Sequence, residues 1–335
     1  MNKLILLLLP ILGFALGWGI HAKFFTRIDN ASPIQNIKEE IQRPLDRYTI
    51  ENLSNAEVPE GKLNLVREIA DEEKYVSYAF SFDFNPTLDK NIVKSTSGQI
   101  NIPKEGNSLP LVLMLRGYID QEAFITGDGT RKAAEFFAQN GFLTVAPDFL
   151  GYGQSDEEAG NIFETRFQTY TTVLSLIKSL NQIEKWNGED IFIWGHSNGG
   201  QIALTTLEIT YASYPTALWA PVSKAFPYSV LFFTDDSVDV GKLIRNELAK
   251  FEETYDVEKY SLTNYFDRIS APLLIQQGEQ DEAFPKTWSD ELVLKLKDID
   301  KDVTYYTYPA TDHNMRPSWN EAILKDLQFF SKHLK

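Results

Sequence analysis

The chain has 335 residues, of which 43% are hydrophobic and 13% aromatic, enough apolar surface for a sizeable core. Its 47 acidic side chains outnumber its 32 basic ones, giving a net charge of −15, and such an acidic surface repels phosphate backbones and argues against nucleic-acid binding. The absence of Cys excludes disulfides, a thiolate nucleophile and cysteine-based metal sites. No HExxH, calcium-loop, GxxxxGK or GxGxxG motif occurs, so neither a metal nor an organic cofactor is expected.

Residues 1–27 form a strongly apolar N-terminal segment. No charged residue lies between Leu4 and Ile20, and Lys3 and Lys23 flank this run. The run is long for the apolar region of a signal peptide and short for a spanning helix. We expect an uncleaved membrane anchor, with a cleaved signal or a buried helix as alternatives. The anchor or the signal would place the rest of the chain outside the cytoplasm, membrane-anchored or secreted.

The remainder of the chain divides into a polar part and a patterned part. Residues 28–73 are charge-rich and contain several prolines, which predicts a spacer. In residues 74–335, strand-like runs alternate with helical periodicity, which predicts one α/β domain with a mostly parallel sheet covered by helices on both faces. The expected strands are 74–84, 93–103, 109–117, 142–149, 190–195, 216–223, 271–278 and 302–309, and the expected helices are 131–140, 167–186, 198–211, 287–298 and 319–334.

One segment interrupts the alternation. Residues 224–267 separate two expected strands and are too long for a plain loop, so we expect them to form a helical cap. Phe226 and Tyr228 make this insert aromatic, which would suit a substrate pocket. Plain core packing is the alternative for both side chains.

The stretch WGHSNGG, residues 194–200, contains a G-x-S-x-G motif between an expected strand and an expected helix. Ser197 at the centre of such a sharp turn takes a strained backbone conformation, and small neighbours let the flanking chains approach. This context predicts that Ser197 is a nucleophile, with a tight turn of no chemical role as the alternative.

A nucleophilic serine needs a base, and the base needs an orienting carboxylate. The chain has four histidines, and His313, just beyond an expected strand, is the candidate base. His196 adjoins the serine, and we expect its ring to point elsewhere. Asp281, just beyond another strand, is the candidate acid. Its competitors are Glu279, Glu282 and Asp312.

The oxyanion formed during acyl transfer needs two backbone N–H donors. Asn198 follows the nucleophile at the start of a helix and would supply one. Tyr118, after the strand that ends at residue 117, would supply the other, with plain loop packing as the alternative for this residue. The chain order Ser197, Asp281, His313 is the order of the α/β-hydrolase fold.

These residues together resemble the α/β-hydrolase superfamily, and within it the catalytic domain of the prolyl oligopeptidase family of serine peptidases and its esterase-like relatives. The resemblance covers about residues 75–335. It implies a serine hydrolase without a cofactor, with Ser197 as nucleophile, Asp281 as acid and His313 as base. The matching stretches are LRGYID, GFLTVAPDFLGYGQSD, IWGHSNGGQIAL, LWAPVS, QQGEQDEAFP and YPATDHNM.

Three functions follow as hypotheses. The first is a peptidase acting on short peptides. The second is a membrane-tethered carboxylesterase acting on small or lipid-like esters, favoured because residues 1–73 are too few for the β-propeller of the family's peptidases. The third is a tethered binding module without catalysis, against which the intact set of catalytic residues argues. The sequence indicates no oligomeric state.

Overall fold

The structure is a computed structural model that describes residues 42–89, 91–234 and 239–335. One compact unit extends from Arg43 to Lys335. The apolar run expected to anchor the chain lies within residues 1–27, outside the described residues, so that role stays a prediction. Across the three described ranges, no helix is both long enough and apolar enough to cross a membrane.

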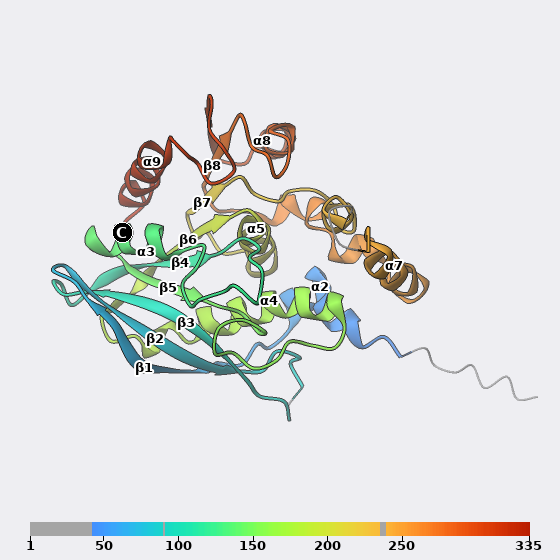
Figure 1. The fold of residues 1–335 in the computed structure, drawn as a ribbon, viewed down its shortest axis with the longest axis horizontal. Coiled ribbons are helices and arrows are strands. Elements are labelled where there is room, and N and C mark those ends of the chain that lie inside the picture. Colours follow the sequence, from blue (N-terminus) through green and yellow to red (C-terminus); the bar gives the residue numbers. More distant parts are fainter. Residues whose placement is uncertain (1–41, 90, 235–238) are drawn as a thin grey trace, which may run out of the picture. The chain divides into compact units, whose positions relative to one another are not determined.

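A nine-stranded sheet runs through this unit in the order β1-β2-β3-β5-β4-β6-β7-β8-β9. The pairs from β1 to β5 are antiparallel, and the pairs from β5 through β4 to β9 are parallel. This arrangement, shown in Figure 1, confirms the predicted α/β-hydrolase fold. The strands are β1 (Lys62–Asp71), β2 (Tyr75–Phe84), β3 (Lys94–Pro103), β4 (Leu109–Leu115), β5 (Leu143–Pro147), β6 (Trp186–His196), β7 (Thr216–Trp219), β8 (Leu273–Gly278) and β9 (Val303–Tyr308).

Helices cover both faces of the sheet because both faces of its central strands are apolar. Leu111 and Leu113 of β4 join the core beneath α4, α5 and α8, while Val112 and Met114 join a second core beneath α3 and α9. Figure 1 shows α3 and α9 on one side and α4 and α5 on the other. The helices are α2 (Ile50–Asn55), α3 (Arg131–Gln139), α4 (Ile162–Lys178), α5 (Asn198–Thr210), α6 (Tyr228–Leu231), α7 (Lys242–Thr254), α8 (Thr287–Asp298) and α9 (Trp319–Lys332).

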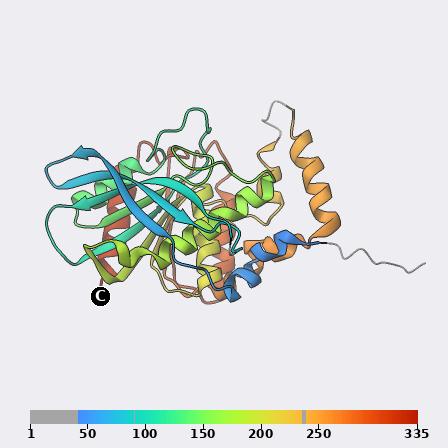
Figure 2. The same ribbon diagram turned by 90° about the horizontal axis from the view of Figure 1, so that it is seen from below.

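The insert between β7 and β8 is helical, as the sequence predicts. It contains α6 and α7, and α7 lies at the periphery of the unit in both Figure 1 and Figure 2. Short 3-10 turns then lead the chain back to the sheet. These turns are η4 (Val257–Tyr260), η5 (Leu262–Asn264) and η6 (Phe266–Arg268). Earlier in the chain, the structure also has the 3-10 turns η1 (Pro44–Tyr48) and η2 (Leu180–Gln182).

The predicted spacer is wrong over much of its described length. Within the range 28–73, the structure places η1, α2 and β1 in the compact unit, and β1 pairs with β2 along its length. Strand β1 is an edge strand whose side chains are largely exposed, so its residues lack the apolar alternation that identifies half-buried strands. Tyr48 and Ile50, by contrast, are fully buried in the main core.

Candidate active site

Ser197 lies at the sharp turn between β6 and α5. Its backbone has φ 55° and ψ −119°, a strained conformation for a residue with a side chain. The surrounding backbone holds this conformation. The Ser197 N–H donates to the carbonyl of Trp219 at 2.9 Å, and the Ser197 carbonyl accepts from the N–H groups of Gly200 and Val222, each at 3.0 Å. The turn therefore presents the hydroxyl from a fixed backbone.

Two glycines around Ser197 are required by close backbone contacts. A Cβ atom at Gly199 would lie 2.0 Å from the carbonyl oxygen of Leu115, and one at Gly195 would lie 2.8 Å from the carbonyl oxygen of Gly199. Only glycine lets α5 start this close to the ends of β4 and β6. The small residues of the motif therefore serve the packing that forms the turn.

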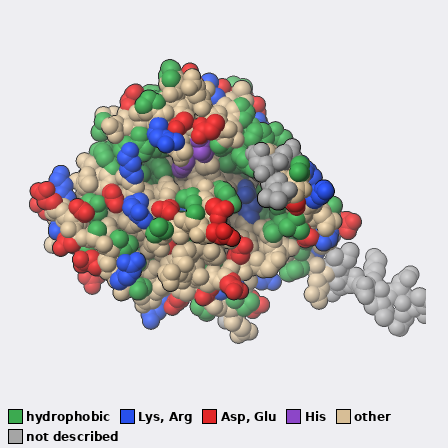
Figure 3. All heavy atoms as spheres, in the orientation of Figure 1, with side chains coloured by type: hydrophobic (Ala, Val, Ile, Leu, Met, Phe, Trp, Pro, Cys, Tyr) green, Lys and Arg blue, Asp and Glu red, His purple; other side chains and the backbone are tan. Residues whose placement is uncertain are grey.

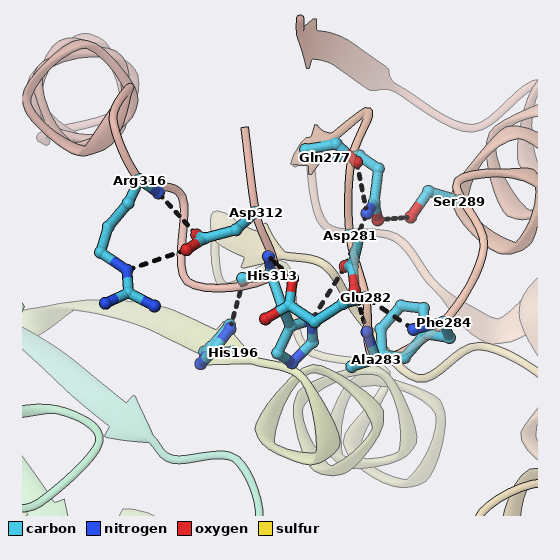
Figure 4. A network of polar contacts seen from close by, with 11 residues as sticks. His196, Gln277, Asp281, Glu282, Ala283, Phe284, Ser289, Asp312, His313 and Arg316 are labelled. Carbon is cyan, nitrogen blue, oxygen red and sulfur yellow. Dashed lines mark hydrogen bonds and ion pairs between the residues drawn. The ribbon is translucent and has the colours of Figure 1, made fainter. Parts of the chain in front are cut away.

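His313 and Asp281 meet at the same edge of the sheet. Asp281 follows the end of β8, His313 follows the end of β9, and these two strands are parallel neighbours. Nδ1 of His313 lies 2.8 Å from Oδ2 of Asp281. A dashed line marks this contact in Figure 4. The Asp281 side chain is completely buried and the His313 side chain is 12% exposed. The carboxylate accepts a hydrogen bond from the Nδ1 proton. The other ring nitrogen, Nε2, therefore carries no proton and can accept one.

The Asp281 carboxylate receives further hydrogen bonds. Nε2 of Gln277 donates to Oδ2 at 2.8 Å, while the backbone N–H groups of Ala283 and Phe284 donate to Oδ1 at 2.8 and 3.2 Å. Burial by itself raises the pKa of this carboxyl, but the His313 hydrogen bond and charge and these donors outweigh it and lower the pKa. Asp281 is therefore held as a carboxylate.

Two of the carboxylates that compete with Asp281 in the sequence have other partners. Glu282 accepts a hydrogen bond from the backbone N–H of His313 at 3.1 Å. It therefore holds the loop that carries His313 and does not orient the imidazole. Asp312 pairs with Nε of Arg316 at 2.8 Å. Figure 4 shows Asp281 as the carboxylate facing the imidazole of His313.

His196 contacts the candidate base, which the sequence interpretation missed when it expected this ring to point elsewhere. Nε2 of His196 lies 3.0 Å from the carbonyl oxygen of His313, and the two ring centroids are 4.7 Å apart. Burial, followed by the charge of His313, lowers the pKa of His196 to about 4. A neutral imidazole facing a carbonyl oxygen must donate, so the Nε2 proton of His196 bonds to the loop that carries His313.

The candidate oxyanion amides lie on both sides of Ser197. Asn198 is the first residue of α5, so its N–H has no acceptor within the helix. On the other side, a Cβ atom at Gly117 would lie 3.0 Å from Cβ and 3.6 Å from Oγ of Ser197, so the loop that continues into Tyr118 lies directly against the serine. Among the backbone hydrogen bonds of turns, loops and helix caps in the described part of the chain, none has the N–H of Asn198 or of Tyr118 as its donor.

A pocket of about 600 Å³ opens beside these amides, and both Asn198 and Tyr118 line it. Phe149 and Ile202 contribute apolar walls, and Arg166 contributes a guanidinium. Figure 3 shows histidine side chains in a hollow on one face of the molecule, with acidic side chains next to them.

The two aromatic residues considered for a substrate pocket differ in their surroundings. Phe226 is 3% exposed and packs against Phe163 and Phe251 in the main core. It is therefore a core residue, which was the alternative to a role in the pocket. Tyr228 is 51% exposed and lines a separate groove beside Trp288. Its role in substrate binding stays a prediction.

The fold defines the class of protein. A sheet of this topology, crossed by a G-x-S-x-G turn, is the α/β-hydrolase fold, and the chain is a serine hydrolase of the peptidase and esterase type. The model of the prolyl oligopeptidase family matches residues 129–335, more than half of the chain. The chain belongs to the prolyl oligopeptidase family.

Individual relatives are distant. The uncharacterized peptidase YtmA of Bacillus subtilis is 26% identical over 204 residues, which cover 59% of this chain and 74% of that protein. Dipeptidyl aminopeptidase BIII of Pseudoxanthomonas mexicana is 24% identical over 254 residues, covering 70% of this chain but only 34% of the aminopeptidase. The structure of acetyl xylan esterase 1 from Thermoanaerobacterium aligns with a TM-score of 0.62 at 16% identity, covering 90% of this chain and 99% of the esterase.

Proposed function

We propose that the chain hydrolyses an acyl bond through a covalent intermediate on Ser197. The observation that carries this proposal is the 2.8 Å contact between Nδ1 of His313 and the buried carboxylate of Asp281. The His313 ring also lies against His196, the residue that directly precedes Ser197 in the chain. Acyl transfer requires a serine hydroxyl within reach of an oriented imidazole, and these contacts support that arrangement for Ser197 and His313.

The reaction proceeds in two halves. Nε2 of His313 takes the hydroxyl proton as Oγ of Ser197 attacks the carbonyl carbon, and it then gives this proton to the leaving amine or alcohol. Water next attacks the acyl-serine, losing its proton to the same Nε2, and the released Ser197 recovers its proton. Asp281 stays ionised throughout, and it stabilises the imidazolium formed in each half.

The oxyanion of each tetrahedral intermediate is bound by the N–H groups of Asn198 and Tyr118. One amide belongs to the first turn of α5 and the other to the loop after β4, and the two are positioned before negative charge develops on the substrate. The N-terminal end of α5 adds positive potential at the same place.

A peptide bond is the substrate that we favour. The family model and the relatives named as peptidases support this choice. An ester is the second candidate, because the same catalytic residues cleave esters and an acetyl xylan esterase shares the fold over almost its whole length. A binding module without catalysis is the remaining alternative, and the oriented Asp281–His313 pair argues against it.

The test compares the purified full chain with its Ser197→Ala variant on matched substrates. Short acyl p-nitrophenyl esters report esterase activity, and aminoacyl and dipeptidyl p-nitroanilides report amidase activity. We expect amide and ester cleavage in the parent, with loss of about four orders of magnitude in the variant. Ester cleavage alone would replace the peptidase by the esterase. Activity that survives in Ser197→Ala would refute the proposed nucleophile.

We propose in addition that residues 1–27 attach this hydrolase to a membrane with its catalytic unit outside the cytoplasm. The uncharged run from Leu4 to Ile20 supports this placement. The full chain should sediment with membranes, whereas a chain lacking residues 1–27 should stay in the supernatant. Equal partition of the two chains into the supernatant would refute the attachment.

A further inference from the structure

Arg166 has no role in the mechanism above, yet its side chain lines the pocket that contains Asn198 and Tyr118. It lies in the second turn of α4, and its side chain is half-buried. Burial lowers the pKa of its guanidinium, which indicates that the charge is poorly solvated. A positive charge that is withdrawn from water is usually paired with an acidic group.

The partners of Arg166 in the described part of the chain are neutral. Its Nη2 donates to Oε1 of Gln201, and the hydroxyl of Tyr170 lies nearby. No carboxylate in the described ranges forms an ion pair with it. A guanidinium carries five N–H donors in a planar fork, so most of its hydrogen-bonding capacity is available to a ligand.

Two other arginines have contacts that differ from those of Arg166. Arg268 forms an ion pair with Glu51. Arg116 lies in the same pocket, but its guanidinium donates to the carbonyl of Asp148 at 2.7 Å and stacks 3.8 Å from the ring centre of Tyr152. The guanidinium of Arg116 is therefore occupied by contacts within the protein. The guanidinium of Arg166 is not, because its partners are few and neutral.

The surrounding side chains hold Arg166 in place. Gln201 bridges two groups, because its Nε2 donates to the Tyr170 hydroxyl at 2.7 Å while its Oε1 accepts from Arg166. Gln201 is 2% exposed and Tyr170 is equally buried. A guanidinium fixed by buried neighbours loses little conformational entropy when it binds an anion.

The position of Arg166 indicates which part of a substrate it would meet. Gln201 is four residues beyond Ser197, about 6 Å along the axis of α5. The pocket is lined by Asn198 and Tyr118, whose amides would hold the acyl oxygen, and His313 does not line it. Because His313 must face the leaving group, the pocket accommodates the acyl side of the substrate.

We propose that Arg166 binds a carboxylate carried by the acyl part of the substrate, so that the enzyme prefers acyl groups that end in a carboxylate a few bonds from the scissile carbonyl. An acidic residue before a scissile peptide bond, or the half-ester of a dicarboxylic acid, has this chemistry. The inference rests on the proposed function, since it names the substrate class of the same site.

Acidic side chains at the rim of the pocket do not cancel this preference. Asp120, Glu122 and Glu158 line the pocket but are exposed to solvent. Water and salt screen charges at the surface strongly, whereas a half-buried guanidinium acts in a lower dielectric. At low salt, the acidic side chains of the rim should slow the entry of anionic substrates. They should not change the contact between Arg166 and a carboxylate that has entered the pocket.

The test uses two esters that differ only at the end of the acyl chain, p-nitrophenyl valerate and the p-nitrophenyl half-ester of glutarate. We expect a higher kcat/KM for the glutarate ester in the parent chain. Arg166→Met should lower the ratio of the two kcat/KM values about 10- to 100-fold, the effect of one charged hydrogen-bonding contact. Arg166→Lys keeps the charge and should retain part of the preference. Lys178→Met, on the exposed end of α4, removes one charge outside the pocket and should leave the ratio unchanged.

A binding measurement separates failure of this inference from failure of the proposed function. Calorimetry with glutarate uses the Ser197→Ala protein with and without Arg166→Met, so it needs no catalysis. We expect the Ser197→Ala protein to bind glutarate more tightly than valerate. This difference should disappear when Arg166→Met is added. Cooperative thermal melting of the double variant would show that it is still folded. An unchanged ester ratio, or equal binding of glutarate in both proteins, would overturn the role of Arg166 even if hydrolysis depends on Ser197. Absence of any serine-dependent hydrolysis, with glutarate binding that depends on Arg166, would overturn only the proposed function.

Discussion

His196 donates its Nε2 proton to the carbonyl oxygen of His313, 3.0 Å away. The residue before the nucleophile therefore holds the loop that carries the base, and it couples the ends of β6 and β9. Because burial keeps His196 neutral, with a pKa lowered to about 4, this donor is present throughout the neutral pH range.

We predict that His196→Phe lowers kcat by about 10-fold, the cost of one lost hydrogen bond at a group that positions the base. The phenyl ring keeps the contact with the His313 ring but removes the donor. KM should change less than kcat, because His196 does not line the pocket beside the amides. His333→Phe, at the C-terminal end of α9, is the control and should leave kcat unchanged. Equal kcat in the two variants would contradict the positioning role.

The pKa of His196 also predicts how stability depends on pH. Between pH 6.5 and about 4, the unfolded chain binds a proton at His196 that the folded chain does not bind. Folded stability therefore decreases as the pH falls through this window, by up to roughly 3 kcal/mol. His196→Phe removes this contribution, so the parent should lose more stability than the variant between pH 7 and 5 in urea unfolding. Parallel pH profiles of the two proteins would contradict the lowered pKa of His196.

Asp281→Asn should lower kcat by about 10³- to 10⁴-fold while leaving the fold intact. An asparagine cannot hold the Nδ1 proton of His313 with a charge, and it can present its NH₂ group to Nδ1, which favours the wrong tautomer. Glu282→Gln is the matched control, since Glu282 binds only the backbone N–H of His313. We expect that control to retain most of its activity on ester substrates. A larger loss in Glu282→Gln than in Asp281→Asn would reassign the acid.

Gly199→Ala should destabilise the chain by about 3 kcal/mol or more, because the new Cβ atom would lie 2.0 Å from the carbonyl oxygen of Leu115 and neither backbone can retreat easily. Gly160→Ala is the control, since a Cβ atom there meets nothing within 4 Å. Thermal unfolding of the two variants measures the difference. Similar melting temperatures would show that the turn does not bring α5 against β4.

Glu208 on α5 predicts a second pH effect with the opposite sign. Both carboxyl oxygens are buried without a hydrogen-bond partner in the described part of the chain, and burial raises its pKa well above the ordinary value. The folded chain keeps a proton there that the unfolded chain releases above about pH 4.3, so stability decreases as the pH rises beyond that point. Glu208→Met should stabilise the chain more at pH 8 than at pH 5. Glu252→Met, on the exposed face of α7, should show no such difference, and an equal gain in both variants would argue against a buried Glu208.

Much of the fold and the geometry around Ser197 could be predicted from the sequence, because the signals are local. The G-x-S-x-G turn, the continuous apolar strands and the loop positions of Asp281 and His313 all lie in short stretches of chain. Parallel strands then bring the ends of β8 and β9 to one edge without further information. The sequence already favours Asp281 as the acid but keeps Glu282 as a competitor. The structure adds that the two carboxylates bind different atoms of His313.

The features missed from the sequence depend on contacts between distant segments. Strand β1 is too exposed to show alternation, and its pairing with β2 defines it. The contact of His196 joins residues 117 positions apart in the chain. Arg166 looks like an ordinary polar residue of a helix until the partners of its guanidinium, Gln201 and Tyr170, are known to be neutral.

Covalent labelling tests the central claim most directly. A fluorophosphonate probe loses fluoride as a serine oxygen bonds to phosphorus, and the serine proton passes to the base. Mass spectrometry of the digested full chain should find one adduct, on the peptide that contains Ser197. It should find none in Ser197→Ala and much slower labelling in His313→Ala. An adduct on another residue, or equal labelling of the parent and Ser197→Ala, would contradict the account.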